Sequence, residues 1–137
     1  MNKYILDACA LIAVLNKEDG AEVVRDIIDK ANDSSVSISM NVVNLLEVYY
    51  GIRRELGQDV ADKVLSSVKS NSIEIVETIN EDIFIEAGRL KSTYRISLAD
   101  SLAIAEASLS GAILITSDHH EFDVIEAAEN IKFHWFR

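Results

Sequence analysis

Four carboxylic acids stand at positions that solvent exposure alone does not explain. Asp7 and Asp118 each come at the end of a short apolar run, Glu47 lies inside a helical stretch that is apolar on nearly all sides, and Asp100 begins another apolar helical stretch. Carboxylates that converge stay ionised only where a cation neutralises them, and oxygen-only ligands select Mg²⁺ or Mn²⁺. These acids therefore predict a divalent-cation site able to bind phosphate oxygens and activate water.

Three of these acids also have a purely structural explanation. Asp7 precedes a predicted helix and is a good N-cap residue, and Asp118 fits an Asx-type turn. Asp100 lies in Ser97-Leu98-Ala99-Asp100, which has the pattern of a capping box ahead of an apolar run. Capping and metal ligation do not exclude each other, because a cap that fixes a helical turn also holds its carboxylate in place.

Glu47 has a different structural explanation. An unpaired charge in an apolar helix is costly to bury, so its carboxylate must face a cleft or find a partner. Arg53 and Arg54, a little further along the same predicted helix, could supply that partner as a salt bridge. The sequence leaves both explanations open, and the cleft is the one that places Glu47 with the other acids.

Other reactive residues favour simpler interpretations. His119 and His120 are adjacent, and adjacent side chains seldom point at one ion, so an exposed loop is expected there. Cys9 has neither a paired histidine nor a Cys-x-x-Cys motif, which indicates a small packed side chain rather than a nucleophile. The five glycines are scattered, so no glycine-rich phosphate loop is present.

The elements that must position the acids alternate between strands and helices. Strands are predicted at residues 3–6, 36–38, 73–76, 112–116 and 132–135, and helices at 8–15, 21–31, 41–56, 59–68, 81–94, 98–109 and 124–128. This alternation predicts an α/β fold with a small, mainly parallel β-sheet of four to five strands flanked by helices. Ligands of such folds bind outside the carboxyl ends of the strands, where Asp7 and Asp118 stand.

Length and composition limit the remaining possibilities. A chain of 137 residues has the size of one domain, so residues 1–137 are expected to form a single unit. With 49% hydrophobic and 26% charged residues the chain is globular rather than disordered, and the absence of proline favours long helices. No apolar run is long enough to cross a membrane, and no signal peptide is recognisable, so a cytoplasmic location is expected.

The charge of the chain places a condition on any nucleic-acid partner. The formal net charge is −10, which repels nucleic acid and anionic membranes. A polyphosphate substrate would therefore need a bound cation or a local basic patch. Arg89, Lys91 and Arg95 ahead of Asp100 are candidates for such a patch, although each also fits a solvated helix face.

Four segments together resemble a known family. The segments 4–12, 44–48 and 96–105, followed by 113–118 with Phe122, are similar in order and spacing to the successive motifs of PIN domains. Within that family the chain resembles the VapC-like ribonucleases of bacterial and archaeal toxin–antitoxin systems. The resemblance spans essentially the whole chain, and four motifs in order are specific where no single one is.

The resemblance implies an activity and a set of partners. It implies a Mg²⁺- or Mn²⁺-dependent endoribonuclease that hydrolyses RNA phosphodiester bonds, with a cognate antitoxin protein and a homodimeric assembly. Asp7, Glu47, Asp100 and Asp118 match the acidic residues of the family one for one, as its metal-binding and catalytic groups. Cys9 departs from the family, where Ser, Thr or Asn is more frequent and a better hydrogen-bond donor to the first acid.

Other functions remain open on the sequence alone. A non-toxin RNA-processing nuclease and a non-catalytic metal- or RNA-binding module would share the same motifs. An aspartyl-phosphate phosphatase also places an acid after its first strand, but it expects a second Asp where this chain has Cys9. If the chain is a non-enzymatic scaffold or a fold whose acids only cap helices, Asp100→Asn should leave any cellular phenotype intact, whereas loss of growth arrest without loss of folding would contradict it.

Overall fold

The sheet at the centre of the protein is entirely parallel. A computed structural model describes all residues from Met1 to Arg137. Its strands are β1 (Lys3–Leu6), β2 (Ser37–Asn41), β3 (Ile73–Val76), β4 (Ile113–Thr116) and β5 (Lys132–Trp135). They lie in the order β3-β2-β1-β4-β5, and every neighbouring pair is parallel. The predicted α/β class with a small parallel sheet is therefore confirmed, with five strands.

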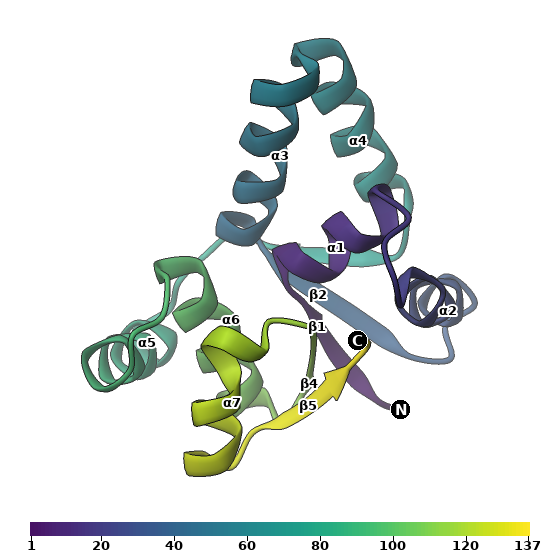
Figure 1. Cartoon of the computed structure of the whole chain (residues 1–137). Helices are drawn as coiled ribbons and strands as arrows, with labels where there is room; N and C mark the ends of the chain where they lie inside the picture. The colour runs from purple at the N-terminus through teal and green to yellow at the C-terminus, as the bar shows by residue number, and fades with distance from the viewer.

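Seven helices connect and cover these strands (Figure 1). They are α1 (Ala8–Leu15), α2 (Ala21–Asn32), α3 (Val42–Leu56), α4 (Gln58–Ser70), α5 (Glu81–Thr93), α6 (Leu98–Ser110) and α7 (His119–Ala128). Most boundaries agree with the predicted ones to within two residues. The exception is α7, which begins at His119 instead of residue 124, because the Asp118 carboxylate accepts the backbone N–H of Glu121 at 3.1 Å and caps the helix.

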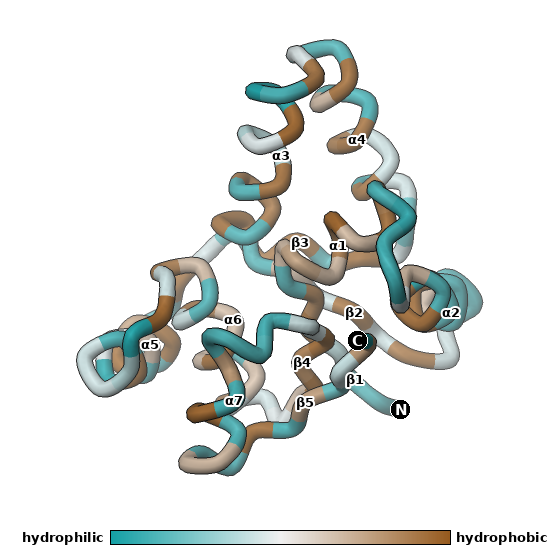
Figure 2. Tube along the Cα trace, in the orientation of Figure 1, coloured by the Kyte–Doolittle hydropathy of each residue, from teal (hydrophilic) through white to brown (hydrophobic).

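The sheet is buried on both faces, and its strands alternate between two hydrophobic cores. Leu6 and Ile115 point into a core shared with α1, α2, α3 and α4, whereas Ile5 and Leu114 point into a core shared with α5, α6 and α7. Figure 2 shows this as brown along β4 at the centre and teal on the outer surface of α2. Apolar residues in unbroken runs, as in β4, are what a doubly covered parallel strand requires.

The direction in which strands are added to the sheet reverses between β1 and β4. After β1 the chain builds outward through β2 and β3, and it then returns to place β4 on the other side of β1, with β5 beyond it (Figure 1). Leu6 at the end of β1 is paired with Ile115 of β4. Loops leave these two strands in opposite directions, which opens a crevice at their carboxyl ends, the usual ligand site of an open α/β sheet.

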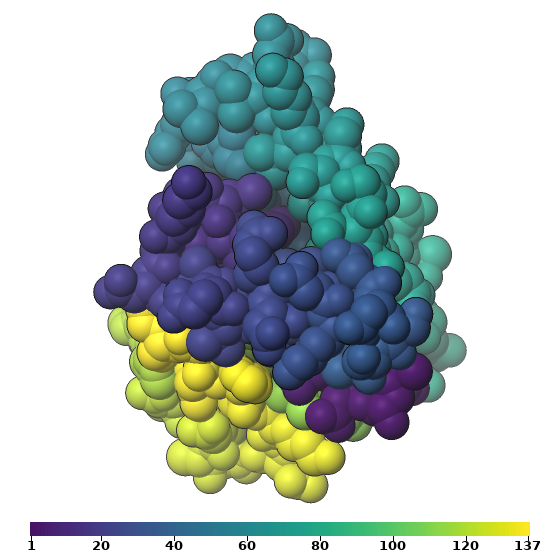
Figure 3. Space-filling model, turned by 90° about the vertical axis from the view of Figure 1, so that its right-hand side faces the viewer, coloured from purple at the N-terminus to yellow at the C-terminus, as the bar shows by residue number.

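Two further features complete the outline of the molecule. Helices α3 and α4 pack against each other and extend beyond the sheet as an arm (Figure 1), and the side view in Figure 3 shows the C-terminal residues against the α1–α2 segment. An ion pair between Arg137 and Glu18 at 3.2 Å fastens that contact. None of the helices combines the length and the apolar character that crossing a bilayer requires.

Candidate active site

Asp7 occupies the first position after β1, at the crevice between β1 and β4. Its side chain is 1% exposed, and it accepts the backbone N–H of Ala10 at 2.8 Å, so it is the N-cap of α1. The pKa of Asp7 is raised to about 6, chiefly because the carboxyl group is buried. The charges of Asp118 and Glu47 contribute to this rise, and hydrogen bonds from Thr116 and Ala10 oppose it. Asp7 is thus both a helix cap and a buried acid on which the charges of two other carboxylates act.

Asp100 is held in the first turn of α6. Its backbone N–H donates to the Ser97 hydroxyl at 3.1 Å, so Ser97 is the predicted cap. Burial raises the pKa of Asp100 to about 8, and the charges of Asp7 and Glu121 add to the effect. Two neighbouring carboxylates thus act on Asp100 from two other elements, which is the convergence that the sequence could only suggest.

Asp118 and Glu121 bring α7 to the same place. Carboxylate oxygens of Asp100, Asp118 and Glu121 all lie within 4.8 Å of one another. The Glu121 carboxylate also accepts the backbone N–H of Ser97 at 3.2 Å, which ties α7 to the start of α6. These residues and Asp7 are called the acidic cluster below.

Glu121 was not selected from the sequence. Its signal was available in the spacing of Asp118 and Glu121, because an N-cap acid followed three residues later by Glu is the capping-box pattern. The predicted helix started at residue 124, so Glu121 stood outside it. Placing the helix start at Asp118 would have put Glu121 in the first turn beside the other acids.

Glu47 lies at the margin of the acidic cluster. It is half-buried on α3, and burial, followed by the charge of Glu121, raises its pKa. The alternative salt bridge to Arg53 or Arg54 is absent from the ion pairs of the protein. The charge of Glu121 thus acts on Glu47, which is not among the three acids whose oxygens meet.

A buried amide joins the elements that carry the acids. Asn44 of α3 is fully buried; its Oδ1 accepts the backbone N–H of Ala8 at 3.3 Å, and its Nδ2 donates to the carbonyl of Ala99 at 3.2 Å. Ala8 follows Asp7 and Ala99 precedes Asp100, so one side chain fixes the two acids relative to each other. The sequence contained no local signal for this role, because both partners are distant along the chain.

Cys9 lies beside the site without the features of a nucleophile. Its Sγ is 2.9 Å from the Ser117 hydroxyl, and burial together with the charge of Asp7 raises the pKa of the thiol. A raised pKa keeps the sulfur protonated at neutral pH, so the thiolate that nucleophilic chemistry needs is disfavoured. The structure agrees with a packed side chain that supports the loop after β4.

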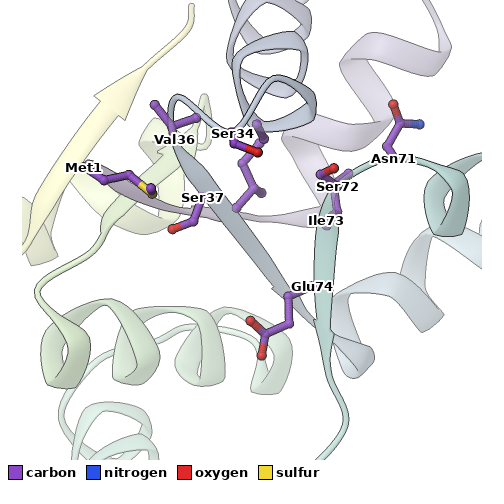
Figure 4. A pocket seen from close by; sticks show the side chains of 10 residues that line it. Met1, Ser34, Val36, Ser37, Asn71, Ser72, Ile73 and Glu74 are labelled. Atoms are coloured by element: carbon purple, nitrogen blue, oxygen red, sulfur yellow. The ribbon is translucent and has the colours of Figure 1, made fainter.

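The most voluminous hollow of the surface lies elsewhere. It has a volume of about 420 Å³ and is lined by side chains from Met1, from the α2–β2 turn and from β2 and β3, as Figure 4 shows for Ser34, Ser37, Ile73 and Glu74. Ser37 and Ile73 begin their strands, so this hollow is at the amino ends of β2 and β3. It contains neither Glu47 nor any residue of the acidic cluster, and it lies at the opposite ends of the strands from the crevice.

The fold and the site together define a class of protein. A parallel α/β sheet whose reversal point gathers carboxylates from three separate elements has the donor set of a divalent-cation site, since every available ligand atom is an oxygen. The sequence profile of the PIN domain matches residues 4–127. The chain therefore belongs to the PIN domain family, a family of nucleases, as its motifs predicted. A search of curated proteins found no significant match.

Solved structures show the same fold over the whole chain. The chain is similar to VapBC2 from Rickettsia felis bound to a promoter DNA fragment (19% identity, 97% of this chain and 98% of that chain, TM-score 0.76). It is also similar to DNA-bound VapBC from Salmonella typhimurium (17% identity, 100% of both chains, TM-score 0.76). VapC20 from Mycobacterium tuberculosis, a sarcin–ricin loop cleaving toxin, has a TM-score of 0.64 at 17% identity over 91% of this chain and 95% of that chain. At these identities the likeness establishes the fold.

Proposed function

We propose that this protein is a metal-dependent endoribonuclease and the toxin of a toxin–antitoxin pair. The observation that carries the proposal is the convergence of the Asp100, Asp118 and Glu121 carboxylates beside buried Asp7, in a chain of the PIN family. The similar structures from Rickettsia and Salmonella are VapBC complexes, and the similar Mycobacterium protein is a sarcin–ricin loop cleaving toxin. RNA is accordingly the proposed substrate.

The acidic cluster fits a divalent cation on electrostatic grounds. Without a cation, mutual repulsion and burial raise the pKa of Asp7 to about 6 and that of Asp100 to about 8, so part of the cluster is protonated at neutral pH. A cation stabilises the ionised forms of all the acids at once. The oxygen-only donors favour Mg²⁺ or Mn²⁺, and both are proposed as the cofactor.

The residues of the cluster would hold the cation and orient the reactants. A bound divalent cation polarises the scissile phosphate and lowers the pKa of the attacking water. Asp7, Asp100 and Asp118 are the proposed ligands, and each is held in place by a helix cap. Glu121 is proposed as a further ligand, held by the backbone N–H of Ser97. Preorganised carboxylates need little rearrangement on binding.

Glu47 is proposed to act on the water. Its carboxylate lies at the margin of the cluster, and its raised pKa makes it a stronger base than an exposed glutamate. Hydrolysis forms a bond between the water oxygen and phosphorus, breaks the phosphorus–oxygen ester bond, and releases a proton that Glu47 is placed to accept. Glu47 thereby completes the four acids that the sequence predicted, as metal-binding or water-orienting groups.

Partners are proposed from the fold and from the exposed apolar surface. Leu46 and Tyr50 of α3 are 55% and 48% exposed, and Phe84 of α5 is 71% exposed. Hollows of about 260 Å³ and 180 Å³ lie on either side of α3. These surfaces support a cognate antitoxin and a homodimer as partners. β5 lies beyond residue 127 and pairs with β4, which supports residues 1–137 as one domain. A cytoplasmic location is proposed for it.

The first experiment is calorimetric titration with Mn²⁺, followed by incubation with RNA. The unmodified protein is expected to bind Mn²⁺ and to cleave single-stranded RNA, whereas Asp7→Asn and Asp100→Asn variants, still folded by circular dichroism, are expected to do neither. Glu106→Gln is the matched control, because Glu106 is a buried acid of the same helix away from the cluster. Unchanged Mn²⁺ binding in Asp100→Asn would contradict the proposed site, and binding without cleavage would indicate a non-catalytic module.

A further inference from the structure

An aromatic stack leads from the second core of the protein to the acidic cluster. The ring centroids of Phe122 and Phe133 are 5.7 Å apart, and those of Phe133 and Trp135 are 5.1 Å apart at an interplanar angle of 9°. Trp135 in turn stacks on His119 with centroids 4.0 Å apart at 13°. The stack ends at His119, the residue that directly follows Asp118.

The His119 ring is held on three sides. Its Nδ1 is 2.8 Å from a carboxylate oxygen of Asp123, its Nε2 is 2.9 Å from the carbonyl oxygen of Arg137, and one face lies on Trp135. Trp135 is itself anchored, because its Nε1–H donates to Glu126 at 2.9 Å. A ring with so many contacts has little conformational freedom left to lose when a ligand binds.

One face of this fixed ring is left open. The His119 side chain is 49% exposed although both nitrogens and one face are in contact with the protein. The exposure therefore belongs to the opposite face and the carbon edges. His119 was expected in an exposed loop; the structure places it instead in the first turn of α7, where the cap at Asp118 determines its direction.

Two of the three candidate basic residues near Asp100 are bonded within the protein. Arg89 bonds to both Glu86 and Glu129, at 2.6 Å and 2.7 Å, and the Lys91 ammonium donates to the carbonyl of Ile96. Arg95 is exposed and is left as the candidate phosphate contact of this patch. Contacts to the bases would add to that single charge as a source of RNA binding at this edge.

We propose that the open face of His119 is a base-stacking subsite that holds a nucleobase of single-stranded RNA beside the scissile phosphate. The inference rests on the proposed ribonuclease function and adds to it the residue that positions the substrate. Aromatic platforms accept any base, because every base has a π-face. Arg137, whose carbonyl contacts the His119 ring, also donates from its guanidinium to the Ser117 hydroxyl at 3.1 Å, so the ring lies at the loop that carries Asp118.

Cleavage kinetics on a short single-stranded RNA test the proposal. His119→Ala is expected to raise KM about tenfold with kcat changed less than about twofold, since stacking contributes to binding and not to bond breaking. His119→Phe keeps a ring face without the nitrogens and is expected to restore most of the affinity. His120→Ala, at the adjacent exposed histidine, is the matched control and should resemble the unmodified protein.

Two outcomes would overturn the subsite. An unchanged KM in His119→Ala would remove it, and a His119→Phe variant as impaired as His119→Ala would show that the nitrogen contacts matter and the ring face does not. An RNA with an abasic position at the nucleotide flanking the cleaved bond sharpens the test. Unmodified protein and His119→Ala should cleave that RNA equally well, because the base they would differ on is missing.

A binding measurement separates the subsite from the proposed activity. Trp135 is the only tryptophan of the chain and touches His119, so its fluorescence reports on this stack directly. A non-hydrolysable analogue of single-stranded RNA, added with Mg²⁺, is expected to change the emission in the His120→Ala variant and not in His119→Ala. If the unmodified protein cleaves no RNA but shows this His119-dependent change, the subsite stands and the nuclease proposal fails. No emission change in either variant overturns the subsite.

Discussion

Two acids of helix α6 differ in what surrounds them. Asp100, half-buried in the first turn, meets carboxylates from two other elements of the fold. Glu106, further along the same helix, is 7% exposed, and its Oε2 has no hydrogen-bond partner. Burial alone raises the pKa of Glu106 to about 7, whereas the pKa of Asp100 reaches about 8 through burial and the charges of Asp7 and Glu121.

Comparing Asp100 with Glu106 distinguishes an acid whose pKa is raised by burial alone from an acid that belongs to a metal-binding site. A lone buried carboxyl group avoids the cost of burying a charge by taking up a proton, and no neighbouring charge then needs to be neutralised. Converging carboxylates are relieved by protons or by one cation, and only the cation leaves them all ionised. A raised pKa therefore does not by itself mark Glu106 as a functional residue. The carboxylate oxygens gathered around Asp100, in contrast, do indicate a functional site.

The largest expected effect contrasts the two regions in catalysis. Asp118→Asn is expected to lower the rate of RNA cleavage by about a thousandfold, because it removes a carboxylate from the cation that stabilises the transition state. Glu106→Gln is expected to change that rate less than about twofold. Initial rates at saturating Mn²⁺ decide the matter, and comparable losses in both variants would erase the distinction between the regions.

The pH dependence of metal binding should differ in the same way. Between about pH 6 and pH 8, the affinity for Mn²⁺ is expected to rise about tenfold for each pH unit, because Asp100 must lose its proton to bind. Below about pH 6, Asp7 is protonated as well and the slope is expected to double. Calorimetry across this range measures it. Glu106→Gln should leave the slope intact, and Asp100→Asn should show no Mn²⁺ binding at any pH in this range.

A smaller effect concerns stability and belongs to Glu106. Its pKa is raised in the folded protein, so folding favours its protonated form, and the penalty for ionising it is complete only above the folded value of about 7. Glu106→Gln is expected to increase the free energy of unfolding by about 2 kcal/mol near pH 8.5. The gain should shrink as the pH falls from about 7 and disappear below about 4.5, where the group is protonated in both states.

Metal ions separate this gain from the corresponding change in the cluster. Urea denaturation of Glu106→Gln should show the same gain with Mn²⁺ and with EDTA, since Glu106 has no part in binding. Asp100→Asn should stabilise the protein in EDTA, where it removes a repelled charge, and should lose that advantage in Mn²⁺. A gain in Glu106→Gln that depended on Mn²⁺ would place Glu106 in the metal site after all.

The smallest expected effect is at Cys9. Cys9→Ser replaces a weak donor with a stronger one beside Ser117 and Asp7, so cleavage is expected to rise by less than about threefold. The free energy of unfolding should change by less than about 1 kcal/mol, because the two side chains are similar in size. Parallel kinetic and denaturation measurements check both statements, and a large loss of activity would show that the thiol has a chemical role.

Much of the fold and part of the site could be predicted locally. The apolar runs that became β1 and β4, and the Ser97 cap that became the start of α6, are encoded within a few residues of one another. Asp7, Asp100 and Asp118 were selected because they stand at such boundaries. Glu121 was missed because the start of α7 depended on recognising Asp118 as a cap as well as a candidate ligand.

Other features required contacts between distant segments. The role of Asn44 depends on its meeting Ala8 and Ala99, and the isolation of Glu106 depends on what surrounds its carboxyl group. The stack of His119 on Trp135 joins the first turn of α7 to the last strand. No periodicity or spacing describes these pairs, because each arises from how separate elements pack.

The sequence by itself determined the alternation of strands and helices, the caps and the acids at their boundaries, because hydrophobic period and capping are properties of neighbouring residues. Only the tertiary structure decided which acids meet. The order β3-β2-β1-β4-β5 places the end of β1 beside the end of β4, and Asn44 and Glu121 then bring α1, α6 and α7 to that crevice. Strand order results from packing energy summed over the whole chain, so convergence at one edge is a property of the fold.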